Sequence, residues 1–171
     1  MNRLQLATLL SWAGDEGMQG RKRLQKVAYC LQQAGCPLDC DYTLHHFGPY
    51  SRDVADICDE MVAAGLVEER GGPKSGVMQY EYRLQERTKE LLQSASPDQQ
   101  MQGFEPLAKS LIADDLWSLE LGSTVLLFHE QNSDWNEAFK KACDFKKVNV
   151  GTESSKKALA LAKKIKEVSA V

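Results

Sequence analysis

A chain of 171 residues fits one domain, or one small domain with a substantial extension, and its 43% hydrophobic and 26% charged residues are ordinary for a soluble globular protein. The formal net charge of −3 provides no general electrostatic attraction to nucleic acid. No apolar run approaches the roughly 20 residues of a membrane span, and the N-terminus lacks a secretory cleavage pattern, so we expect a cytoplasmic protein without a membrane partner. The five cysteines lack the spacing of a disulfide framework, which predicts reduced thiols.

Two helices are predicted at the start of the chain. Apolar residues recur at helical spacing over residues 4–12 and 20–34, and Gly35 and Pro37 end the second helix. The pattern then changes to a short β-like stretch over residues 42–47.

A third helix is predicted after a glycine-proline pair. Gly48 and Pro49 predict a turn, and Ser51 directly after them has the side chain of a helix N-cap. Gly65 is a suitable residue to close this helix at its C-terminus.

A hairpin is predicted to follow the third helix. Its strands cover residues 66–70 and 77–84, joined by GGPKSG, a loop too long for a two-residue turn. A further helix is predicted over residues 85–94. Three helices followed by a hairpin are the plan of a winged-helix domain, so residues 1–94 are predicted to form a winged-helix-like core.

The second half of the chain is predicted to be helical. Residues 95–103 are polar and contain Pro97 and Gly103, which is typical of a loop or linker. Helical spacing of apolar residues then predicts helices over residues 104–113, 114–131, 133–143 and 154–168. The predicted fold class is therefore mainly α with a small β-hairpin, in which the helical part, residues 104–171, packs on the core as one unit.

The predicted third helix is acidic for an element that would read DNA. Its exposed face is predicted to carry one cation and four carboxylates, which are Arg52, Asp53, Asp56, Asp59 and Glu60. Carboxylates repel phosphate, whereas DNA binding depends on cations that release counterions. We therefore expect a solvated or partner-facing acidic surface here, and not a helix that enters the major groove.

A basic cluster opens the second helix and consists of Arg21, Lys22, Arg23 and Lys26. Cations at a helix N-terminus oppose the helix dipole, so helix stability does not account for them. Three partners remain open for this cluster, namely a phosphate backbone, the acidic third helix and an acidic partner protein.

Cations elsewhere offer a second route to nucleic acid. Residues 140–171 hold nine lysines against three acidic residues. The candidates for phosphate contacts on the hairpin and the last helix are Arg70, Lys74, Lys156, Lys157, Lys163 and Lys164. The alternative is that the lysines form the polar face of an amphipathic helix.

The least favoured candidate is a metal site at Cys36, Cys40 and His45. The spacing of the two cysteines lies at the edge of the range found in structural zinc sites, and Cys30 falls on the predicted buried side of its helix. We therefore expect neither a metal nor a cofactor. The sequence also lacks the motifs of hydrolases, metalloproteases and phosphate-binding loops, so we expect no enzyme.

Short motifs in both halves are similar to one group of proteins. RLQKVAY at residues 23–29, HFGPYS at residues 46–51 and VADICDEMVAAGLVEE at residues 54–69 resemble the YwgA-like family and the related Panacea group of phage-associated and antitoxin-like proteins. LWSLELGSTVLLFHE at residues 116–130 resembles their second helical segment. The resemblance implies a winged-helix-like fold and a role in protein or DNA contacts, and the cysteines of the first half depart from the family pattern.

Two functional hypotheses follow. The first is a non-enzymatic regulatory or interaction protein, antitoxin-like or adaptor-like, that binds a protein partner through the acidic face and the basic cluster. The alternative is a winged-helix transcription regulator that binds DNA with basic residues outside the third helix.

Overall fold

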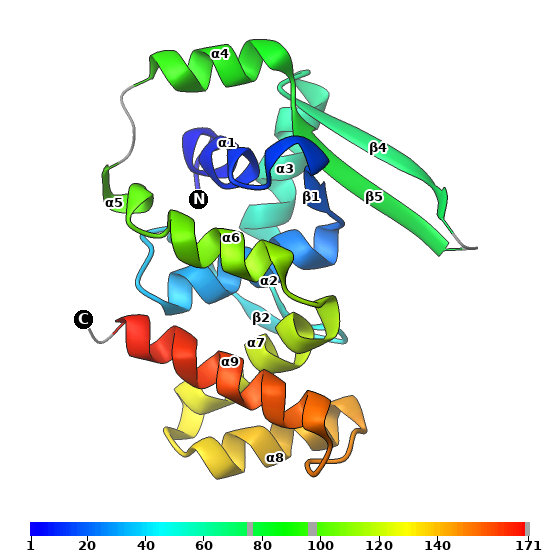
Figure 1. Ribbon diagram of the computed structural model, residues 1–171, viewed down its shortest axis with the longest axis vertical. Helices are drawn as coiled ribbons and strands as arrows, with labels where there is room; N and C mark the ends of the chain where they lie inside the picture. Colours follow the sequence, from blue (N-terminus) through cyan, green and yellow to red (C-terminus); the bar gives the residue numbers. More distant parts are fainter. Residues whose placement is uncertain (75–76, 96–98, 170–171) are drawn as a thin grey trace.

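Helices make up most of the structure, and one long β-hairpin projects from it (Figure 1). The computed structural model describes residues 1–74, 77–95 and 99–169. The elements in chain order are α1 (Arg3–Ser11), η1 (Gly14–Glu16), β1 (Met18–Gln19), α2 (Arg21–Gln33), β2 (Thr43–His45), β3 (Gly48–Tyr50), α3 (Arg52–Ala63), β4 (Val67–Lys74), β5 (Val77–Leu84), α4 (Glu86–Ser94), α5 (Gln99–Gln102), α6 (Glu105–Ala113), α7 (Leu116–Asn132), α8 (Trp135–Lys146) and α9 (Glu153–Ser169). The predicted class, mainly α with a small β-hairpin, is confirmed.

The long hairpin is more extended than the sequence predicts. Strand β5 lies between β1 and β4 in an antiparallel sheet, and its pairing with β4 continues to Lys74 and Val77. The prediction of a long loop over GGPKSG was therefore wrong, because Gly71 to Lys74 continue the ladder. Gly71 pairs with Tyr80, whose ring would lie 2.8 Å from a Cβ at this glycine. An aromatic ring that covers a strand glycine supplies the packing that the glycine lacks.

A second, short hairpin is formed by β2 and β3. His45 pairs with Gly48, so the turn consists of His46 and Phe47. The prediction of a turn at Gly48 and Pro49 was wrong by two residues, because both belong to β3. Proline is tolerated there because an edge strand of a two-stranded ribbon can lack a ladder hydrogen bond.

The caps of α3 are those that the sequence predicts. The Ser51 hydroxyl accepts a hydrogen bond from the Val54 amide at 3.4 Å. At the other end Gly65 has φ +66°, and the Leu66 amide donates to the Met61 carbonyl at 2.9 Å. The left-handed conformation of Gly65 and the hydrogen bond from Leu66 back to Met61 together terminate the helix.

Helix α7 forms the centre of the C-terminal half. It is buried on every side from residue 118 to residue 127 and packs against α2, α8 and α9. The polar side chains buried in this stretch all have partners within the chain, and they are Ser118, Glu120, Ser123 and Thr124. Within the part of the chain that the structure describes, no helix combines the length and apolarity needed to cross a membrane.

The segment between the two halves contains one helical turn. The sequence predicts a loop over residues 95–103, but Gln99–Gln102 form α5, and Met101 within it is completely buried. Burial of this side chain explains helical structure in an otherwise polar segment. Residues 96–98 lie outside the described ranges.

His129, in the last turn of α7, is expected to make stability depend on pH below neutrality. Its ring stacks on Trp135 with the ring centroids 3.8 Å apart. Burial, together with the nearby Lys166 ammonium, lowers the pKa of this imidazole from its usual 6.5. The unfolded chain then takes up a proton before the folded protein does, so the free energy of unfolding falls as the pH drops through the usual imidazole pKa.

Urea unfolding at about pH 7.5 and about pH 5.5 measures this effect, which should stay well below the ~1.4 kcal/mol per pH unit of a full proton because the ring is partly solvated. The variant His129→Phe keeps a stacked ring without a titrating nitrogen. It should lose less stability over the same interval, and equal losses in the two proteins would contradict the assignment.

Candidate partner-binding surface

One side of α3 is exposed and acidic. Val54, Cys58 and Met61 are buried, and they recur at the spacing of one helical face. The residues predicted to form the exposed face are all in solvent, and they are Arg52, Asp53, Asp56, Asp59 and Glu60. The periodicity of the helix is therefore sufficient to predict which residues of α3 form this exposed surface.

Most of these carboxylates also have a partner within the chain. The contacts are Asp53 with the Asp41 amide at 2.9 Å, Asp59 with Arg21 at 2.7 Å, and Glu60 with Arg3 at 3.3 Å. Such exposed contacts contribute little to stability and exchange readily with other partners. Asp56 makes no hydrogen bond or ion pair with the described residues, so its carboxylate is available to another molecule.

Arg21 lies where α2, α3 and β4 meet. Its Nη2 atom lies 2.7 Å from the Asp59 carboxylate and 3.0 Å from that of Glu69, and its Nε donates to the Tyr82 hydroxyl at 2.6 Å. That hydroxyl donates to Glu69 at 2.5 Å, and the bonds from Tyr82 and Arg21 hold the pKa of Glu69 below its usual range. The sequence allowed three kinds of partner for Arg21, and the structure shows it paired with one of them, the acidic helix α3.

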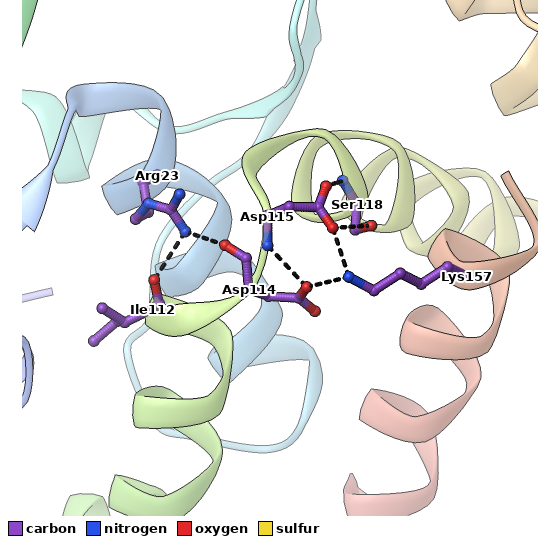
Figure 2. A network of polar contacts seen from close by, with 6 residues as sticks. All are labelled: Arg23, Ile112, Asp114, Asp115, Ser118 and Lys157. Atoms are coloured by element: carbon purple, nitrogen blue, oxygen red, sulfur yellow. Dashed lines mark hydrogen bonds and ion pairs between the residues drawn. The ribbon is translucent and has the colours of Figure 1, made fainter. Parts of the chain in front are cut away.

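Arg23 binds the backbone where α6 meets α7 (Figure 2). Its Nη1 atom donates to the carbonyl of Ile112 at 2.8 Å and to that of Asp114 at 2.6 Å. Burial lowers the pKa of this guanidinium. From the other side of the junction, Lys157 of α9 binds the carboxylates of Asp114 and Asp115 at 2.7 and 2.6 Å. Arg23 therefore joins the two halves of the chain.

Lys26 and Lys22 have opposite surroundings. Lys26 is only 2% exposed, and its ammonium donates to the Pro49 carbonyl at 2.6 Å. Burial lowers the pKa of this lysine to about 8. Lys22 stays exposed, with its Nζ 3.3 Å from the centre of the Phe47 ring. The predicted basic cluster is therefore not one surface, because Arg23 and Lys26 point inward.

The other candidate phosphate contacts are scattered over the molecule. Arg70 pairs with Glu68 on the same strand at 2.9 Å, and the side chain of Lys74 lies outside what the structure describes. Two lysines of α9 form ion pairs: Lys156 pairs with Glu153 at 2.9 Å, and Lys157 pairs with the two carboxylates at the start of α7. The Nζ of Lys163 lies 5.9 Å from the Trp135 ring centre, and Lys164 is exposed. Acidic neighbours thus offset several of these charges.

The candidate metal ligands are not gathered into one site. Cys36 and Cys40 are buried, whereas His45 is exposed and stacks on Tyr50 with the ring centroids 4.5 Å apart. Burial raises the pKa of the Cys40 thiol, which disfavours the thiolate that zinc binds. Among the residues that the structure describes, no three His, Cys, Asp or Glu side chains are grouped to hold a metal ion.

A cavity of about 380 Å³ lies between α2, the β2–β3 hairpin and α3. Its apolar wall comes from side chains of all three segments, which are Leu24, Phe47, Tyr50, Val54, Ala55 and Cys58. Sequence reasoning missed this cavity because no single segment contains it. No local signal in the sequence marks Lys26 as part of a cavity, because Gln25 and Gln33 on the same helix are also polar and buried.

The chain is related to a curated bacterial protein over most of its length. It is 33% identical over 124 residues to the "Uncharacterized protein YwgA" of Bacillus subtilis (strain 168), and the match covers 71% of this chain and 73% of that protein. No protein-family model matches the chain. Identity of this degree over nearly three quarters of both sequences indicates common descent, and the chain therefore belongs to the YwgA-like family.

Proposed function

We propose that this chain is a non-enzymatic regulatory protein of the cytoplasm that binds a protein partner through the exposed face of α3. In this proposal, residues 1–94 are a winged-helix-like core and residues 104–171 pack on it as one unit. The role is antitoxin-like or adaptor-like. The similarity of the FGPYS segment and its flanking helices to the Panacea group supports the antitoxin-like role.

The charge on α3 is the observation that carries the proposal. In a winged-helix protein this helix would enter the major groove, where its exposed side chains would lie close to phosphate. Four exposed carboxylates in that position repel the backbone, whereas nucleic-acid binding requires cations. A protein partner with basic side chains would instead be attracted by the same surface.

The positions of the cations on α2 also favour a protein partner over nucleic acid. Arg21 is held by Asp59 and Glu69, Arg23 by backbone carbonyls, and Lys26 is buried. A phosphate that displaced Glu69 from Arg21 would leave a half-buried carboxylate without its cation. Such displacement costs binding energy, so this end of α2 is poorly suited to follow a nucleic-acid backbone.

Asp56 is the best single position at which to test the proposal, because it has no partner among the described residues whose loss would disturb the fold. The variant Asp56→Lys should weaken partner binding by roughly tenfold or more. Partners are first recovered from cells of the source organism with the wild-type chain, and the affinity of the purified pair is then measured by calorimetry.

Glu90→Lys is the matched control, since it reverses an exposed carboxylate on α4 and makes the same change in net charge. A partner that binds both variants as tightly as the wild type would contradict the proposal. Fluorescence anisotropy on random-sequence duplex DNA tests the DNA-binding alternative. Affinity that falls steeply with salt would favour a regulator that uses its basic residues on phosphate.

A further inference from the structure

The cavity between α2, the β2–β3 hairpin and α3 has the character of a small-ligand site. Its volume of about 380 Å³ lies toward the small end of ligand pockets. Leu24 and Val54 are buried in its wall, and the exposed ring of Phe47 stands beside it. Pockets of this kind bind an apolar body and use a few polar groups to orient it.

The side chains that bring a full charge to this cavity are all cations. Arg21, Lys22 and Lys26 contribute to its lining, together with His45 and His46, and none of the described lining residues is Asp or Glu. An apolar cavity lined by cations without a carboxylate is complementary to a ligand that joins an apolar body to a negative charge.

Lys26 is the group that a negative charge would satisfy. Lys26 is only 2% exposed as a residue, yet its ammonium carries three donors, and the Pro49 carbonyl is the acceptor that the described residues provide. The nearby Glu120 carboxylate is engaged by Lys146, whose Nζ lies 2.5 Å from its Oε1. A buried ammonium with unused donors is costly, and an anion in the cavity would remove that cost.

We infer that this cavity binds a small amphipathic carboxylate, whose two oxygens accept hydrogen bonds from Lys26 and whose apolar body packs against Leu24, Val54 and Phe47. A carboxylate fits better than a phosphate, because a dianion with several acceptor oxygens would need more donors than one buried ammonium offers. The exposed Lys22 ammonium, held above the Phe47 ring, adds positive charge at the same cavity. This inference does not rest on the proposed function, although Arg21, which pairs with Asp59 on the acidic face, also lines the cavity.

Two probes of matched shape distinguish the contribution of charge to binding from that of apolar burial. 4-Phenylbutyrate and its neutral analogue 4-phenylbutyramide are titrated into the full chain, and binding is followed by amide chemical shifts in NMR spectra. The carboxylate is expected to bind roughly tenfold tighter or more, because its charged hydrogen bond to Lys26 is stronger than the neutral hydrogen bond of the amide. Its shifts should concentrate in α2, the β2–β3 hairpin and α3. Inorganic phosphate should bind more weakly than the carboxylate.

Three variants locate the contacts. Lys26→Met keeps the length of the side chain and should abolish the preference for the acid over the amide. Ala55→Phe, at a half-buried position of the lining, should fill the cavity and weaken both probes. Lys109→Met, which removes an exposed cation on α6, is the control and should bind as the wild type does.

The proposal fails if the acid and the amide bind the wild type equally, or if neither binds at millimolar concentration. It also fails if Ala55→Phe leaves the affinity for the acid unchanged. Should Lys26→Met not fold, the comparison of acid with amide and the response to Ala55→Phe still decide the question. Neither measurement depends on a protein partner, so its outcome is separate from that of the Asp56 experiment.

Discussion

Replacing Lys146 with methionine is expected to lower the free energy of unfolding by about 3 kcal/mol. The Lys146 ammonium lies 2.5 Å from the Glu120 carboxylate, and the two side chains are only 6% and 11% exposed. Methionine keeps most of the aliphatic stem but leaves the Glu120 charge buried without this partner. The same ammonium donates to the His46 carbonyl at 3.2 Å, so the change also releases the β2–β3 turn from α8.

Urea unfolding of wild type and variant measures this loss. The double variant Glu120→Gln with Lys146→Met should be more stable than Lys146→Met alone, because it removes the unpaired charge as well. Lys141→Met is the matched control, since Lys141 pairs with Glu137 at 2.6 Å on the same helix but in solvent. Equal losses for Lys141→Met and Lys146→Met would mean that burial of the Glu120–Lys146 pair does not determine its contribution.

The second large effect is expected at Gly48, where alanine should cost about 3 kcal/mol. Gly48 has φ +91°, a conformation that residues with a Cβ rarely adopt. A Cβ at this position would lie 2.4 Å from the Thr124 Oγ1 and 3.4 Å from the Glu120 carbonyl. Strain in the backbone and collision with α7 therefore act together.

Gly65→Ala separates these two causes. Gly65 also has positive φ, +66°, but nothing lies within 4 Å of a Cβ there. Its replacement should cost only about 1 kcal/mol, the strain of a left-handed residue. Adding Thr124→Ala to Gly48→Ala should recover part of the loss, as thermal or urea unfolding would show. A cost at Gly48 no larger than at Gly65 would contradict the close packing of β3 against α7.

Local signals in the sequence predicted much of the fold. The spacing of apolar residues placed α2, α3 and α7, and the caps at Ser51 and Gly65 placed both ends of α3. These signals suffice because a helix and its caps depend on residues within about four positions of one another. The loop over GGPKSG was mispredicted because pairing with β5 and the Tyr80 ring overrides the local preference of glycine and proline.

The chemical environment of the basic cluster could not be predicted in the same way. Arg23 bonds to Ile112, 89 positions away, and Lys26 bonds to Pro49, 23 positions away. Nothing in the local pattern distinguishes these cations from Lys22, which stays at the surface. Their burial depends on which distant segments the fold brings against α2.

The sequence by itself determined the helical class, the bounds of α3, the acidity of its exposed face and the membership of the YwgA-like family. Only the tertiary structure decided which cations reach solvent, and only it assembled the cavity beside Lys26. The reason is physical: helix periodicity and capping arise within a few residues, whereas burial, ion pairing and cavities arise between segments that meet only when the chain folds.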